Sequence, residues 1–236
     1  MSPSSTKEKK AKSTATPKAV EMLEGADQHW YRHVGSDLWL PSVSTVLGAL
    51  KDGLEYVSPY DLKKAQERGT KVHKATELLE EGQELQKLFY SAQEWDMLGG
   101  FINWHHETKP VTILSEHKMS SKKLGYAGTL DRLYLFGMSV LVDIKTTSAI
   151  YDKAWLQVAA YATLTEKEGH KVDHTAILRL TDRSAAKYQY VECCSKSHPT
   201  HWRDDLKVFN HHLATYQYLY GGSQPKESDL PDTMSL

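Results

Sequence analysis

Residues 128–147 read GTLDRLYLFGMSVLVDIKTT, and this stretch decides the fold. Two apolar, β-prone runs flank Gly137, a pattern typical of two strands joined by a turn. Asp131 and Asp143 lie at equal distances on either side of that glycine. A hairpin centred there places the two carboxylates directly opposite each other, with Cβ atoms about 5 Å apart, unless a bulge shifts the register. Lys145 follows Asp143 by two residues and is expected on the same face.

This arrangement of charges predicts a particular chemistry. Two carboxylates about 5 Å apart repel each other unless a cation compensates them. A hard divalent ion such as Mg²⁺ prefers oxygen ligands and keeps several waters. Lys145 beside it is suited to holding or deprotonating a nucleophilic water, or to neutralising a phosphoryl oxygen. Two Asp and one Lys around a metal suit phosphodiester hydrolysis, although a surface hairpin with a cross-strand Asp–Lys pair has the same spacing.

The segments around the hairpin alternate between helical and strand-like patterns. A short strand pair is expected within residues 29–47. Helices are expected from Ser58-Pro59 with a break at Gly69, from a capping box at Ser91 to His106, from a cap at Asp152 to Gly169, and over 199–220. Strands are expected at 111–119, 126–136, 139–145, 174–180 and 187–192. This order predicts a mixed α/β fold.

Composition excludes several classes of protein. The chain has 236 residues and a net charge of −1, so no strong basic excess points to nucleic acid. No apolar run approaches about 18 residues, which predicts a protein without a membrane span. The two adjacent cysteines, Cys193 and Cys194, exclude an iron–sulfur cluster and indicate an intracellular location. We expect a basic tail at 1–25, one domain at 26–222 and a flexible tail at 223–236.

Four short motifs occur in an order that resembles a known family. They are GTKVH ending at His73, GTLD ending at Asp131, DIK from Asp143 to Lys145, and QVAAY from Gln157 to Tyr161. Together they resemble the PD-(D/E)XK nuclease superfamily, in its RecB-type branch. The upstream segment LPSVSTVL is similar to one in phage exonucleases and in the mitochondrial genome maintenance exonuclease. The resemblance implies a restriction-endonuclease-like α/β core (αβββαβ), with a mixed central sheet flanked by helices.

The resemblance also implies a role for each matched residue. His73, Asp131, Asp143 and the backbone carbonyl of Ile144 would bind Mg²⁺ or Mn²⁺, and Glu116 would be a further carboxylate near the metal. Lys145 would position or activate the attacking water. Gln157 would orient Lys145 or the scissile phosphate, and Tyr161 would support the site or touch phosphate. Candidate DNA-binding residues are those near the motifs with hydroxyl or basic side chains: Ser42, Ser44, Arg68, Lys71, Lys122 and Lys123.

Three functions remain open at this point. The first is a Mg²⁺- or Mn²⁺-dependent DNA exonuclease that favours single-stranded or frayed ends. The second is a structure-specific or restriction-like endonuclease of the same superfamily. The third is a non-catalytic DNA-binding protein on a nuclease fold. By resemblance, a compact nuclease of this kind suggests a phage protein acting in the cytoplasm of a bacterial host, with DNA as its partner.

Overall fold

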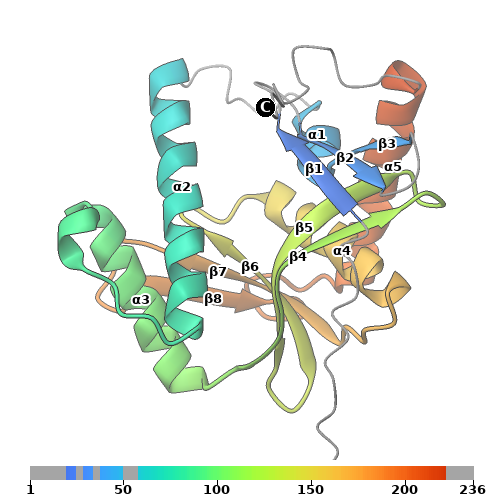
Figure 1. Ribbon diagram of the computed structural model, residues 1–236. Coiled ribbons are helices and arrows are strands. Elements are labelled where there is room, and N and C mark those ends of the chain that lie inside the picture. Colours follow the sequence, from blue (N-terminus) through green and yellow to red (C-terminus); the bar gives the residue numbers. More distant parts are fainter. Residues whose placement is uncertain (1–19, 25–28, 34–37, 50–57, 222–236) are drawn as a thin grey trace, which may run out of the picture.

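The computed structural model describes residues 20–24, 29–33, 38–49 and 58–221 (Figure 1). A small antiparallel sheet comes first along the chain and has the order β1-β2-β3. Its strands are β1 (Val20–Glu24), β2 (His29–His33) and β3 (Trp39–Pro41). Strands β2 and β3 confirm part of the predicted pair and β1 adds a third strand, but the prediction is wrong for residues 43–47, which lie in a helix started by the Ser42 cap. Because β1 lies within residues 1–25, the tail predicted there is too long by at least these five residues.

The central sheet has five strands in the order β4-β5-β6-β7-β8. They are β4 (Val111–Ser121), β5 (Tyr126–Leu135), β6 (Ser139–Lys145), β7 (His174–Leu180) and β8 (Tyr188–Glu192). Strands β6 and β7 are parallel, whereas the other neighbouring pairs are antiparallel. A parallel pair needs a crossover connection, and the helix between these two strands supplies it. The predicted mixed α/β fold class is confirmed.

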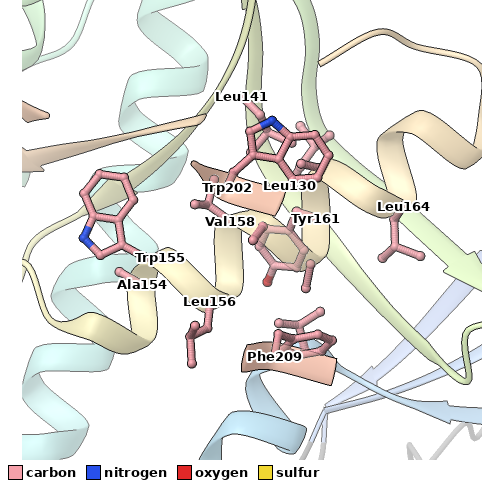
Figure 2. Close-up of a cluster of buried hydrophobic side chains, with 14 of the residues drawn as sticks. Leu130, Leu141, Ala154, Trp155, Leu156, Val158, Tyr161, Leu164, Trp202 and Phe209 are labelled. Atoms are coloured by element: carbon pink, nitrogen blue, oxygen red, sulfur yellow. The ribbon is translucent and has the colours of Figure 1, made fainter. Parts of the chain in front are cut away.

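Helices cover both faces of this sheet (Figure 1). They are α1 (Val43–Gly48), α2 (Pro59–Glu80), α3 (Ala92–Thr108), α4 (Asp152–Lys167) and α5 (Trp202–Tyr220), with a short 3₁₀ helix η2 (Lys87–Phe89) before α3. One apolar core forms between the sheet and α2 with α3. A second forms between the sheet and α1, α4 and α5, where Leu130 and Leu141 meet Val158, Tyr161 and Phe209 (Figure 2).

Helix ends follow the predicted capping residues in most places. The Ser58 and Ser91 side chains accept backbone hydrogen bonds at the starts of α2 and α3, and Ser91 forms the predicted capping box with Glu94. Two predictions are wrong. Helix α2 runs unbroken through Gly69, where an added Cβ would lie 3.5 Å from Thr146 Oγ1, an ordinary van der Waals contact. Asp152 is the first residue of α4 and does not cap it, because Tyr151 occupies that position.

Two further predictions concern the chain ends and membranes. The tail predicted at 223–236, and residues 1–19 of the other tail, lie outside the described residues. Within the described ranges, no helix combines the length and apolar character needed to cross a membrane.

Candidate active site

Strands β4, β5 and β6 bring three acidic residues into one row. The β5–β6 ladder pairs Arg132 with Val142 and turns at Gly137, which has a φ of 83°. The next step of this register would pair Asp131 with Asp143, as the sequence predicts. The β4–β5 ladder pairs Ser115 with Arg132 and His117 with Leu130, so Glu116 stands opposite Asp131.

Hydrogen bonding at this row departs from a regular ladder. The β5–β6 ladder ends at Arg132 and Val142, one step before the two aspartates. Instead, the Asp131 carboxylate accepts a hydrogen bond of 2.6 Å from the Ile144 backbone nitrogen. Asp131 therefore bridges to β6 through its side chain, and its other carboxylate oxygen faces α2.

Helix α2 adds His73 to this row. Nδ1 of His73 lies 3.6 Å from Asp131 Oδ1 and 3.9 Å from Glu116 Oε1. Its Nε2 lies 2.9 Å from the Ile144 carbonyl oxygen. Because a carbonyl oxygen can only accept, Nε2 carries the proton, and a neutral ring then leaves Nδ1 with a free lone pair. Burial lowers the pKa of His73, which favours the neutral ring.

These contacts create a set of acceptor atoms suited to a cation. One atom from each of His73, Glu116 and Asp131 lies within 4.8 Å of the others. With Nδ1 unprotonated, all three are acceptors, and none can donate to another. Glu116, predicted as a further carboxylate near the metal, thus belongs to this set. The Ile144 carbonyl, also predicted as a ligand, accepts the hydrogen bond that orients the His73 ring.

Asp143 lies in the row but turns its carboxylate to Lys145. Lys145 Nζ lies 2.9 Å from Asp143 Oδ2 and donates a hydrogen bond of 3.1 Å to Oδ1. Oδ2 is buried and receives no hydrogen bond of good geometry from any described residue. It is therefore an available ligand atom beside the set formed by His73, Glu116 and Asp131.

A hydrogen-bonded chain orients Lys145 from helix α4. Lys145 Nζ donates to Gln157 Oε1 at 3.0 Å, and Gln157 Nε2 donates to the Tyr161 hydroxyl at 2.9 Å. Gln157 and Tyr161 are four residues apart and lie on one face of α4. The ring of Tyr161 packs so closely on Gly128 of β5 that a Cβ there would lie 2.4 Å from its Cε1. The first glycine of the GTLD motif thus makes room for this ring.

The carboxyl groups of the row are difficult to ionise in their surroundings. Burial raises the pKa of Asp143 to about 6; the Lys145 charge opposes the shift and the Asp131 charge adds to it. Burial also raises the pKa of Asp131 and of Glu116. For Lys145, burial lowers the pKa, but the charges of Asp143 and Asp131 outweigh it, so the net pKa is raised. The lysine is therefore a protonated donor.

Two residues of the site are not apparent from the motifs. The Arg132 side chain is fully buried; it pairs with Glu80 of α2 and donates to Glu116 Oε1 at 2.9 Å. Its position after Asp131 in the printed sequence is the only signal that could have singled it out. Glu80 lies two turns after His73 on α2, and that helical spacing could have placed it on the same face.

The predicted DNA-binding residues fall into three groups. Arg68 lies close to the site, because its NH2 donates to the Thr146 carbonyl at 3.3 Å. Lys71, one turn on, pairs with Glu94 at 2.9 Å. Lys122 and Lys123 are exposed in the β4–β5 turn, and the six-residue strand segment from Tyr126 to Asp131 separates them from the row by about 16 Å.

The two predicted serines differ in their surroundings. Ser42 is buried, and its hydroxyl caps the six-residue helix α1 by accepting from the Thr45 nitrogen at 2.9 Å. Ser44 is exposed, and its hydroxyl lies 2.8 Å from that of Ser42. The local structure thus uses Ser42 as a helix cap.

Comparison with known proteins yields distant structural similarity. No protein-family model and no curated protein matches the sequence. The chain is similar to the alkaline exonuclease LHK-Exo from Laribacter hongkongensis, with a TM-score of 0.37 and 10% identity over 75% of this chain and 90% of that one. The structure of LHK-Exo in complex with dAMP gives a TM-score of 0.37 and 13% identity over 75% of this chain and 88% of that one. Such low scores carry no functional assignment, which rests on the residues of the site.

Proposed function

We propose that this protein is a divalent-metal-dependent DNA exonuclease that hydrolyses phosphodiester bonds, favouring single-stranded or frayed ends. One observation carries the proposal: the acceptor set of His73, Glu116 and Asp131 lies beside an Asp143–Lys145 pair. Four of these five residues, all except Glu116, come from the motifs that resemble the RecB-type branch and occur in the same order, which supports a nuclease.

Charge balance supports a divalent ion at this site. Glu80, Glu116, Asp131 and Asp143 contribute four negative charges when ionised, and Arg132 and Lys145 contribute two positive charges. The remainder is −2, which one Mg²⁺ or Mn²⁺ neutralises. Burial is the main cause of the raised pKa values of Glu116, Asp131 and Asp143, and the charge of Asp131 adds to the shift for Glu116 and Asp143; a cation among them would favour the ionised carboxylates. The donor set of carboxylates and one imidazole fits either ion.

The protein residues have separate roles in this proposal. His73, Asp131, Asp143 and Glu116 would hold the metal, which when bound polarises a phosphoryl oxygen and acidifies a bound water. The protonated Lys145 donates hydrogen bonds and positive charge toward the phosphate or the attacking water, so of its two predicted roles we favour positioning over deprotonation. Gln157 fixes the direction of Lys145 Nζ, and Tyr161 fixes Gln157.

The alternatives predict different reactions on the same DNA. An endonuclease of this superfamily would cut a circular single strand, whereas an exonuclease requires an end. A non-catalytic DNA-binding protein would bind without cutting; the presence of Asp143, Lys145 and the acceptor set together argues against it.

The test is digestion of end-labelled single-stranded, duplex and circular single-stranded DNA, with a single-stranded RNA as a further substrate. Each is incubated with Mg²⁺, Mn²⁺ or EDTA. We expect linear DNA to be shortened from an end with either metal, circles to stay intact, and EDTA to abolish cleavage. Cut circles would instead establish the endonuclease, and digestion in EDTA would refute a metal-dependent reaction.

Two variants connect any activity to this site. Lys145→Ala and Asp143→Asn should each reduce the rate by on the order of 10²–10³-fold. Lys118→Ala, in the part of β4 nearer the β4–β5 turn, is the control for a lysine substitution and should retain activity. Circular dichroism confirms that each variant is folded. Full activity in a folded Lys145→Ala preparation would contradict the assigned mechanism.

A further inference from the structure

Among the residues that the structure describes, Arg132 is the arginine with a fully buried side chain, and it forms ion pairs with Glu80 and Glu116. NH1 of its guanidinium donates to the Asp131 carbonyl of its own strand, β5, at 2.7 Å, and the guanidinium also contacts two other elements. Nε pairs with Glu80 of α2, and NH2 donates to Thr76 Oγ1 of the same helix at 3.2 Å. NH1 donates at 2.9 Å to Glu116 Oε1 of β4. Burying a guanidinium is costly unless all its charge and donors are matched, so these contacts are strongly coupled.

The contacts on α2 share a face with the proposed metal ligand. His73, Thr76 and Glu80 follow a spacing of three and then four residues, which aligns them along one side of a helix. Thr76 also donates from its hydroxyl to the His73 carbonyl at 2.8 Å. The guanidinium of Arg132 therefore holds α2 just beyond His73 and fixes how far along the sheet the His73 ring lies.

On the strand side, Arg132 contacts a residue with an unusual backbone. Glu116 has a φ of 44°, in the left-handed region that is strained for a residue other than glycine. The β4–β5 register also shifts just before it, between Thr112 and Leu114. The Glu116 side chain is 31% exposed and so has access to solvent. Its carboxylate accepts a hydrogen bond from Arg132 through the same Oε1 that faces His73.

We propose that Arg132 is a positioning residue of the metal site: its buried guanidinium, anchored on Glu80 and Thr76, holds the Glu116 carboxylate beside His73 and Asp131. This inference rests on the proposed function, because it presumes that these groups bind a divalent ion. Arg132 acts through Glu116 and touches neither metal nor substrate. A planar guanidinium can engage both carboxylates at once, whereas a lysine offers a single point charge.

A purely structural role for Arg132 makes a different prediction. If Arg132 only neutralises Glu80 inside the protein, replacing it affects stability and not the metal site in particular. Any effect on metal affinity would then persist when Glu116 is also replaced. If Arg132 acts through Glu116, the effect disappears once Glu116 cannot be a charged ligand, so a double-mutant cycle separates the two roles.

The experiment measures Mn²⁺ binding to the metal-free full-length protein by titration calorimetry, without DNA. The variants are Arg132→Lys, Glu116→Gln and the double substitution. Arg203→Lys is the matched control, because Arg203 pairs with Glu166 on the surface. We expect Arg132→Lys to weaken Mn²⁺ binding by about 10-fold or more, as substitutions behind metal ligands commonly do. Adding it to Glu116→Gln should cause less than a twofold further loss, and Arg203→Lys should bind normally.

Glu80→Gln provides a second variant if Arg132→Lys does not fold. It keeps the arginine but removes its charged partner on α2, and it should weaken Mn²⁺ binding only while Glu116 is intact. Thermal unfolding checks the folding of each variant.

Three outcomes overturn the inference while leaving the proposed function in place. The first is that folded Arg132→Lys, or folded Glu80→Gln where the lysine variant does not fold, binds Mn²⁺ with wild-type affinity. The second is that the substitution weakens Mn²⁺ binding equally in the wild-type and Glu116→Gln backgrounds. The third is that Glu116→Gln itself binds Mn²⁺ with unchanged affinity. A wild-type protein that binds no Mn²⁺ refutes the metal-dependent function instead, and the positioning role with it.

Discussion

Gly128 has no side chain, and this allows the Tyr161 ring of α4 to pack directly on strand β5 at the site. A Cβ at this position would lie 2.4 Å from Cε1 of Tyr161. Gly128→Ala should therefore push Tyr161 and Gln157 away from Lys145, destabilise the fold by about 1–3 kcal/mol and lower activity. Gly99→Ala in α3 is the control, because a Cβ there has no atom within 4 Å. That change should stabilise the protein by about 0.5–1 kcal/mol, measured by urea denaturation.

Asp143 gives the site a dependence on pH. Its pKa is raised to about 6, chiefly by burial, and a protonated carboxyl cannot serve as a metal ligand. Mn²⁺ affinity should therefore decrease as the pH falls through about 6 and level off above it, as calorimetry at several pH values would show. Asp143→Asn should remove this contribution. An affinity that is flat between pH 5 and 7 would contradict the assignment of Asp143 as a ligand.

The same pKa shift affects the stability of the metal-free protein in the opposite sense. Because the folded-state pKa of Asp143 lies above its ordinary value, the folded state binds a proton more tightly than the unfolded state between about pH 4 and 6. The contribution of Asp143 to the free energy of unfolding therefore decreases as the pH rises through this range. Added Mn²⁺ should reverse the loss, which thermal unfolding with and without metal would reveal.

The sequence predicts some residues of the site better than others for a physical reason. Asp131 and Asp143 flank Gly137 symmetrically, so a tight hairpin sets their register locally. The contact between Glu116 and Arg132 depends on the longer β4–β5 pairing and on its register shift, which no nearby sequence feature predicts. Their approach to α2 depends on tertiary packing, which neither spacing nor composition encodes.

At the scale of elements, Glu94 links the two helices that cover one face of the sheet. Its carboxylate accepts from the Ser91 nitrogen at 2.7 Å at the start of α3 and pairs with Lys71 of α2 at 2.9 Å. Glu94→Ala should destabilise the fold by about 1–2 kcal/mol, since it removes half of a capping box. Urea denaturation measures the loss, and Glu84→Ala, in an exposed segment before η2, should change it little.

The contribution of Glu94 to the free energy of unfolding depends on pH. Burial raises the pKa of Glu94, but its hydrogen bonds with Ser91 and Lys71 outweigh burial, so the net pKa is lowered. Its stabilising effect is therefore present above the ordinary glutamate pKa and is lost as the pH falls through the lowered value. The difference between wild type and Glu94→Ala should shrink in acid.

Element boundaries were predictable where local chemistry sets them. Ser58-Pro59 and the Ser91 capping box act within one turn, and both helices begin where the sequence indicates. Gly69 predicts a break because glycine weakens a helix, yet tertiary contacts keep α2 continuous there. The sequence does not predict strand β1, because a strand of five residues depends on its neighbour β2 and its alternation of apolar and polar residues is broken after Met22.

At the scale of the whole molecule, a net charge of −1 conceals an uneven distribution. Some of the acidic side chains are concentrated in the proposed metal site, where a bound cation would present positive charge to phosphate. A net charge close to zero therefore does not exclude DNA binding. It predicts modest, salt-sensitive binding through few phosphate contacts rather than the coating of long duplexes.

The position of Arg68 makes this prediction specific. Arg68 reaches the Thr146 carbonyl next to Lys145, and its Nε is buried and donates to no described residue. If it contacts phosphate, Arg68→Gln should reduce the slope of log affinity against log salt for single-stranded DNA by about 0.7. Fluorescence anisotropy with Ca²⁺ in place of Mg²⁺ measures this slope. The Lys122→Gln, Lys123→Gln double variant should leave the slope unchanged, because both lysines lie at the far end of the β4–β5 hairpin. A larger change in that double variant than in Arg68→Gln would place the bound DNA along the hairpin rather than beside α2.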